Sequence, residues 1–341
     1  MHFPVGLSTK EDIDTFVGAL EPCIPYSLPI LGYIFHSDGS GAYRMNNTSP
    51  SAHLCTPKVQ IWSSQSDLKS VTSRQALFSI VLFSESDRQF RFFCSAEASG
   101  IPPTLEEQEH VKEMLGSLMK SIVSDDPNYR TIVPPPSSVD DADESFIFIG
   151  SVHEIWISAL HSYSPKIKPC HVKYIYPPVK YVSPTSSLQT SSLLEANGWT
   201  ISQILPSEVD LVKATSGVSR SHDYLLGRSS SSVCVRDVNN SSAPVAWGLI
   251  HADGSIGSLY VQPDYRRRGL ARLVIQELSR KSVQRGGEEE IGIGRTCGTL
   301  GWNWTDVAKS NDKSIRFMES LGGWNKEWSC YWLYLATSTS T

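Results

Sequence analysis

Several patterns that would define a function at once are missing from this sequence. Its seven cysteines are scattered along 341 residues without a C-x-x-C pair, which excludes the usual zinc spacings. Neither a lysine-bearing Walker loop nor the three-glycine dinucleotide fingerprint occurs, so the two commonest phosphate loops are disfavoured. We therefore expect no metal site and no permanently bound cofactor.

Targeting and membrane signals are also lacking. The N-terminus, residues 1–14, carries Glu11, Asp12 and Asp14 without an apolar signal-peptide core, and no apolar run approaches bilayer length. These features predict a cytoplasmic protein with reduced thiols and no membrane partner. The formal net charge of −5 argues against a nucleic-acid partner, because no broad basic surface is available to displace counterions from phosphates.

The composition is that of an ordinary globular protein with two domains. Hydrophobic residues make up 40% and charged residues 19% of the chain, and its length suits two cores. A serine- and threonine-rich stretch around 183–192 predicts a linker. We accordingly predict one domain over 1–182 and a second over 193–341.

Both predicted domains show the same order of strands, helix, strand, helix and strand. In the first, strands are expected over 27–35, 58–62, 76–83, 89–94, 145–149 and 171–176, and helices over 104–124 and 152–163, with an exposed loop at 133–143. In the second, strands are expected over 232–237, 244–251, 257–261, 304–308 and 328–335, and helices over 193–198, 207–215, 270–278 and 311–321, with an insertion at 286–302.

The most informative stretch is a strand, a turn and a helix that contain Arg266-x-x-Gly269-x-Ala271. Gly269 stands where the helix begins, and a residue without Cβ there lets backbone N–H groups approach a ligand closely. The helix N-terminus adds unpaired donors and partial positive charge. Because Arg266, Arg267 and Arg268 add three cationic side chains, the stretch predicts a site for a di- or triphosphate group.

This loop resembles the pyrophosphate-binding signature of the GCN5-related N-acetyltransferases (GNAT), which holds acyl-coenzyme A. The resemblance extends over 193–341 through a second motif, Asn311-x-x-Ser314-x-x-Phe317. The segment from Pro244 to Leu270 is similar to the glycine N-acyltransferase-like, or FR47-like, branch. The resemblance implies an α/β fold (an α+β mixed sheet) made of tandem GNAT-like domains, the N-terminal one degenerate and without a pyrophosphate loop.

The first domain fits that implication, because its corresponding loop, residues 95–103, has no arginine. Pro102 and Pro103 remove backbone donors, and Glu97 would repel phosphate. The loop therefore predicts a scaffold that binds no pyrophosphate.

The resemblance also implies which residues of the second domain contact acyl-CoA, the expected co-substrate. These are Leu259, Tyr260, Val261, Arg266, Arg267, Arg268, Gly269, Leu270, Ala271, Asn311, Ser314 and Phe317. The implied reaction is attack of a neutral amine, from a small molecule or an amino acid, on the thioester, with a main-chain N–H near Val261 polarising the carbonyl.

The residue that would deprotonate the amine is not evident. The family often places a glutamate where this sequence has Ser255, and the nearby alternatives are Asp253 and His251, either of which could act through a water. A purely structural role is also open for both, with Asp253 as a turn residue and His251 as a side chain at the end of a strand. The tyrosine that many relatives use to protonate the leaving thiolate falls at Met318. The alternatives are therefore a small-molecule N-acyltransferase, a protein N-acetyltransferase, and a catalytically silent acyl-CoA-binding protein.

Overall fold

The computed structural model describes residues 2–36, 59–71, 76–85, 88–120, 146–161, 166–167, 171–176, 194, 198–284 and 302–336. The predicted linker at 183–192, the loop at 133–143 and all but the last residue of the insertion at 286–302 lie outside these residues, as does most of the helix expected over 193–198. We call residues 2–176 the N-terminal half and residues 194–336 the C-terminal half.

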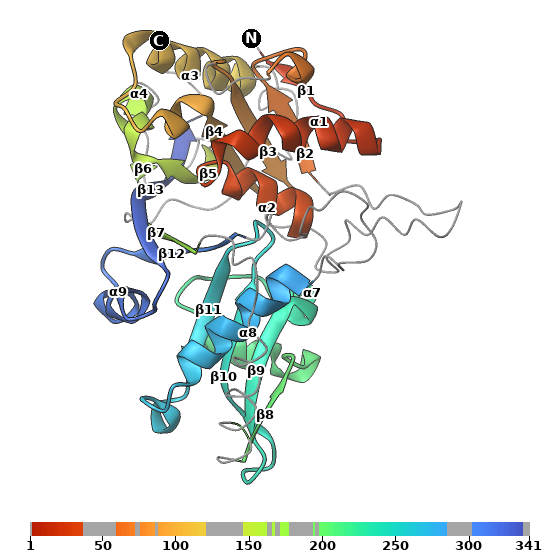
Figure 1. Cartoon of the computed structure of the whole chain (residues 1–341), viewed down its shortest axis with the longest axis vertical. Coiled ribbons are helices and arrows are strands. Elements are labelled where there is room, and N and C mark those ends of the chain that lie inside the picture. Colours follow the sequence, from red (N-terminus) through yellow and green to blue (C-terminus); the bar gives the residue numbers. More distant parts are fainter. Residues whose placement is uncertain are drawn as a thin grey trace.

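The described strands form two sheets (Figure 1). The strands are β1 (Phe3–Pro4), β2 (Val59–Ser63), β3 (Ser79–Ser84), β4 (Gln89–Cys94), β5 (Phe146–His153), β6 (Lys166–Ile167), β7 (His171–Tyr176), β8 (Trp199–Ser202), β9 (Ser232–Asp237), β10 (Ala243–Ile250), β11 (Ile256–Val261), β12 (Asn303–Ala308) and β13 (Asn325–Ala336). One sheet has the order β1-β2-β3-β4-β5-β13-β7-β12, with β6 paired to β13, and the other has the order β11-β10-β9-β8. The fold is therefore mixed α/β.

The two halves exchange their last strands. β13, from the C-terminal half, pairs antiparallel with β5, and β7, from the N-terminal half, pairs antiparallel with β12 and β13. In Figure 1 the blue β13 accordingly lies beside the yellow-green β5 and β6. The predicted division at 183–192 stays a prediction, but the larger sheet is continuous across it.

The helices lie on both sides of these sheets (Figure 1). They are α1 (Lys10–Leu20), α2 (Leu28–His36), α3 (Leu105–Leu118), α4 (Ile157–Leu160), α6 (Val209–Thr215), α7 (His222–Gly227), α8 (Leu270–Gln284) and α9 (Asp312–Glu319). The largest core cluster takes residues from both halves, among them Phe16 and Leu31 from the first and Trp247 and Leu249 from the second. The halves therefore share a hydrophobic core.

Two sequence predictions in the N-terminal half are wrong. The apolar run predicted as a strand over 27–35 is helix α2, whose residues are almost all buried, so its pattern shows no alternation that would separate helix from strand. The helix predicted over 152–163 begins late, because β5 continues to His153 and only Ile157–Leu160 is α-helical. The helix predicted over 104–124 is α3, and it begins with a capping box in which Thr104 and Glu107 are bonded to each other's backbone N–H groups.

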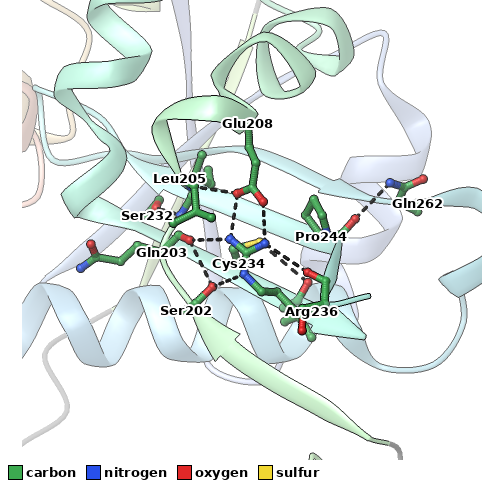
Figure 2. A network of polar contacts seen from close by, with 12 residues as sticks. Ser202, Gln203, Leu205, Glu208, Ser232, Cys234, Arg236, Pro244 and Gln262 are labelled. Carbon is green, nitrogen blue, oxygen red and sulfur yellow. Dashed lines mark hydrogen bonds and ion pairs between the residues drawn. The ribbon is translucent and has the colours of Figure 1, made fainter. Parts of the chain in front are cut away.

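In the C-terminal half, Arg236 of β9 forms hydrogen bonds with β8 and with the segment that leads to α6 (Figure 2). Its Nη2 lies 2.8 Å from Glu208 Oε2, and its Nε donates to the Ser202 hydroxyl at 2.7 Å. Burial alone would raise the pKa of the Glu208 carboxyl, but the hydrogen bonds from Arg236 and from the backbone of Leu205 lower it. This network secures β8 and the turn before α6 against β9.

No helix in the described part of the chain is both long enough and apolar enough to cross a bilayer.

Candidate functional site

The predicted phosphate loop joins β11 to α8 through a short 3-10 helix at Pro263–Tyr265. Arg267 and Gly269 both have left-handed backbone conformations, with φ of 62° and 83°, and such a turn points successive N–H groups toward one side. The side chains of Arg266, Arg267 and Arg268 are exposed. The first N–H groups of α8 have no intrahelical acceptor. The loop thus presents backbone donors and three cationic side chains together.

Contacts within the loop fix its shape. The Tyr265 hydroxyl donates to Asp237 Oδ2 at 2.7 Å. The Arg266 Nε donates to the carbonyl of Val261 at 3.1 Å, and the Arg268 Nη2 donates to the carbonyl of Asp264 at 3.0 Å. These bonds orient two of the three arginines around the loop rather than away from it, so a bound anion would meet charges that are already positioned.

Among the described strands, β11 has a partner on one edge only, and its other edge lies next to this loop. It pairs with β10 on one side and is the last strand of its sheet, while the neighbouring β12 is the last strand of the other sheet. The described residues of β11 and β12 contact each other without a sheet ladder. The pairing of β11 with β10 also shifts register at Ser258, whose φ is 51°, as in a β-bulge. Backbone groups of Leu259 and Val261 therefore lie on or beside an edge that an extended ligand could join.

The second predicted motif lies close to the first. Arg272, in the first turn of α8, donates from Nη2 to the carbonyl of Ser320 just after α9, at 2.9 Å. Asn311 caps α9, because its Oδ1 accepts from Ser314 N at 3.1 Å, and Phe317 packs on the core of the C-terminal half. Those contacts give Asn311, Ser314 and Phe317 structural roles, and a role in CoA binding stays a prediction for them.

The three candidate bases lie together in the turn between β10 and β11. Asp253 Oδ1 accepts from the Ser255 hydroxyl at 2.6 Å and from Ser255 N at 3.0 Å. Asp253 Oδ2 lies 3.1 Å from Arg91 Nη2, a guanidinium that β4 of the other half supplies. Burial alone would raise the pKa of the Asp253 carboxyl, but Arg91, His251 and the Ser255 hydrogen bonds hold it below its usual range. Asp253 is therefore an ion-paired carboxylate.

His251 is buried and held by Tyr224. The Tyr224 hydroxyl accepts from Ala252 N at 3.2 Å and lies 3.1 Å from His251 Nδ1. The direction of the hydrogen bond between Tyr224 and His251 follows the tautomer of the imidazole. Burial, together with nearby arginines, lowers the pKa of His251 to about 3. The ring is therefore neutral at physiological pH.

The His251 ring faces β11, the strand that carries Leu259, Tyr260 and Val261, three of the residues expected to contact acyl-CoA. A methyl group built on Gly257 of β11 would lie 2.6 Å from His251 Nε2. A glycine is needed there because any side chain would displace the imidazole. The His251 Nε2 is consequently placed against β11, close to the bulge at Ser258.

The turn that carries these residues is packed against the N-terminal half. A side chain at Gly32 of α2 would collide with the backbone carbonyl of Asp253. Arg228 donates from Nε to the Ile250 carbonyl at 3.0 Å and also donates to the carbonyl of His36. Arg91 itself is buried, with its guanidinium 4.8 Å from the Trp332 ring centroid. The N-terminal half thus fixes the position of the candidate bases.

Sequence reasoning missed Arg91 and Tyr224. Arg91 stands in an otherwise apolar strand, QFRFFC, and a charged residue within a fully buried strand is itself a signal that a partner carboxylate must exist. Nothing local to Tyr224 links it to His251. No cluster of His, Cys, Asp or Glu able to hold a metal occurs among the residues described above.

Comparison with known proteins bears out the resemblance. Residues 234–294 match the family model described as FR47-like protein, a segment that includes β10, β11, the arginine loop and α8. The predicted FR47-like resemblance is thereby confirmed for that segment, and the glycine N-acyltransferase-like branch stays a prediction.

A solved structure shares the fold, and two others are similar at lower TM-scores. A Drosophila protein determined by X-ray crystallography is 13% identical, with a TM-score of 0.59 and coverage of 98% of both chains. A GCN5-related N-acetyltransferase from Kribbella flavida is 13% identical, with a TM-score of 0.42 and coverage of 75% of this chain and 86% of that one. A tandem GNAT protein from the clavulanic acid biosynthesis pathway is 10% identical, with a TM-score of 0.48 and coverage of 100% and 99%. The predicted mixed α/β fold is confirmed, and the tandem GNAT-like arrangement with a degenerate first half stays a prediction.

Proposed function

We propose that this protein is an acyl-CoA-dependent N-acyltransferase that transfers an acetyl or other short acyl group to the amine of a small molecule or an amino acid. The observation that carries the proposal is the adjacency of the open β11 edge and the left-handed loop Arg266–Ala271. An extended pantetheine arm would pair with the strand edge, and the pyrophosphate would occupy the loop at the start of α8.

In the proposed reaction the neutral amine nitrogen attacks the thioester carbonyl carbon. A C–N bond forms, the C–S bond breaks, and coenzyme A leaves as a thiolate that takes up the proton lost by the amine. A main-chain N–H near Val261 would stabilise the developing oxyanion. A thiol has a pKa of about 8.5, so the thiolate leaves without the tyrosine that this chain replaces with Met318.

No candidate base is matched to a neutral pH. Asp253 is ion-paired with Arg91, and its pKa lies below the usual range, because Arg91, His251 and Ser255 outweigh its burial. The His251 Nδ1 is occupied by Tyr224, and burial lowers the pKa of its ring to about 3. A general base works best when its pKa is near the working pH. The enzyme would therefore capture the fraction of amine that is already neutral.

The same observation supports a second candidate, a catalytically silent acyl-CoA-binding protein. Both candidates bind coenzyme A, and only the enzyme releases free thiol when an amine is added. The test is a thiol-release screen of acetyl-, propionyl- and longer acyl-CoA against amino acids, polyamines and peptides, with Gly269→Val as the inactive control. Amine-dependent release supports transfer, and release with peptides alone would indicate a protein N-acetyltransferase. If the protein binds acyl-CoA but releases no thiol under any condition, the second candidate, a catalytically silent acyl-CoA-binding protein, is supported.

A further inference from the structure

The N-terminal half has a pocket at the position that corresponds to the proposed coenzyme A site. In the C-terminal half the phosphate loop follows β11 and precedes α8, and the strand across the gap is β12. In the N-terminal half the corresponding segments are β4, the turn at 95–103, α3 and β5. A pocket of about 620 Å³ lies between that turn, the end of β5 and the Glu327–Trp328 segment of the exchanged strand β13.

Carboxylates line this pocket. Glu97, Glu154 and Glu327 all contribute, and none of the described residues that line it is a lysine or an arginine. Glu97 is buried and its Oε1 accepts from Cys94 N at 3.0 Å and from Trp156 Nε1 at 2.9 Å, both uncharged donors. The pocket is therefore acidic where its counterpart carries three arginines.

Aromatic rings form one wall. The Tyr26 ring stacks on Trp328 with centroids 4.4 Å apart, and the His153 ring lies 5.4 Å from Trp328. Burial, and then the negative charges of Glu327 and Glu97, raise the pKa of Tyr26, so the field of the carboxylates extends to the aromatic wall. Rings of this kind attract cations through their electron-rich faces.

The remaining wall is apolar. Ile101, Pro102 and Pro103 also line the pocket, and Ile101 is 67% exposed. An apolar wall suits methylene groups, and carboxylates suit N–H donors. A ligand that has both an alkyl chain and an ammonium group would satisfy all three surfaces.

We propose that this pocket binds a small alkylammonium ion, a second ligand site in the half that lacks the arginine loop. Reversal of the local charge turns a position that would hold pyrophosphate into one that excludes phosphate and favours an amine. Glu154 Oε1 accepts from Ser329 N at 3.1 Å, and the exposed carboxylates of Glu154 and Glu327 offer further hydrogen-bond acceptors. A primary ammonium therefore fits better than a quaternary one. The inference does not depend on acyl transfer, because no residue of the arginine loop takes part.

Calorimetry of the full-length protein with cadaverine at low ionic strength tests the proposal, with 1,5-pentanediol as the matched uncharged probe. We expect saturable binding of cadaverine at one site and none of the diol. The double variant Glu154→Gln/Glu327→Gln should weaken cadaverine binding about tenfold or more, because each lost charge removes a charge-assisted hydrogen bond. Glu319→Gln, an exposed carboxylate on α9, is the control and should change nothing.

Three results would overturn the proposal. These are no cadaverine binding up to millimolar concentration, equal binding of the diol, and unchanged binding in the double variant. If cadaverine is also an acyl acceptor, Gly269→Val separates the two sites, since it should remove acyl-CoA binding and leave cadaverine binding at the acidic pocket intact. Failure of this pocket to bind would leave the proposed acyl transfer untouched.

Discussion

The segment after β4 and the segment after β11 are counterparts in the two halves, and they differ in charge and in the strand gap beside them. After β11, the chain turns through Arg267 and Gly269 with positive φ, and β11 has no ladder to β12. After β4, the chain forms a 3-10 helix closed by Glu97, and β4 keeps a parallel pairing with β5 at Phe90 and Arg91. The same architecture thus opens a strand edge in one half and closes it in the other.

The N-terminal half, in which the edge of β4 is paired, supports the candidate site of the C-terminal half. Its β4 supplies Arg91 to Asp253, its α2 supports the turn that carries His251, and its β5 receives β13. If the halves were separated, β12 would lose its partner β7, and β13 would lose its partners β5, β6 and β7. Experiments on this protein should therefore use the full chain.

The largest effect is expected from changes in the arginine loop. Gly269→Val and the double variant Arg266→Glu/Arg268→Glu should each abolish acyl-CoA binding, because the first strains a residue with φ of 83° and the second reverses the local field. The matched control is Gly100→Val in the other half, where φ is 66° and a side chain would also meet open space. Calorimetry should show wild-type affinity for the control. If both loop variants keep the wild-type affinity for acyl-CoA, the arginine loop is not part of the acyl-CoA site.

Loss of the ion pair between the halves should have the next largest effect. Arg91→Met leaves the Asp253 carboxylate buried without its partner, which typically costs about 3–5 kcal/mol. Urea unfolding should show this loss, and Arg91→Met/Asp253→Asn should lose less than the single variant. A cost below about 1 kcal/mol, typical of exposed pairs, would contradict the buried pair described here.

The pH dependence of that stability follows from the sign of the shift. The pKa of folded Asp253 is lowered because Arg91, His251 and Ser255 outweigh its burial. The unfolded chain therefore takes up a proton first as the pH falls. The contribution of the ion pair should be fully present above about pH 4, the ordinary range of an aspartate, and should be lost as the pH falls through the lower folded value.

The smallest effect concerns the base. With the pKa of His251 near 3 and that of Asp253 lowered, neither group titrates between about pH 6 and 9. Hence log kcat/KM should rise with unit slope toward the pKa of the acceptor amine. Ser255→Glu should raise kcat/KM at neutral pH by about tenfold or more, since general-base catalysis is worth about 10²–10⁴ at best, and should add a new lower inflection.

Its control is Ser255→Ala, which should leave the slope unchanged. A wild-type profile that reaches a plateau near pH 6–7 with a high-pKa amine would show that a base exists. A loss of about 10²-fold in His251→Gln would then locate it.

The sequence predicts the strand, loop and helix over 257–278 better than the fold around them, because this pattern is local. Arg266, Gly269 and Ala271 are neighbours in sequence, and their chemistry needs only a strand before them and a helix after them. The strand exchange depends on contacts between β5 and β13, which lie about half of the chain apart, and no local pattern specifies it. Helix α1 is not among the predicted helices, although the residues of its capping box, Thr9 and Asp12, are a local signal for it. The sequence shows Arg91 as a charged residue in an apolar strand, but it does not show that Asp253 is its partner.

The difference between the two halves is tested most directly by amide hydrogen exchange with and without acyl-CoA. One experiment on one molecule compares the open segment, residues 257–272, with its closed counterpart, residues 89–105. We predict that acyl-CoA slows exchange in 257–272, because the ligand takes the free N–H groups of β11, the arginine loop and the first turn of α8. Exchange in 89–105 should be unchanged. Protection in 89–105, or in neither segment although the ligand binds, would contradict the account.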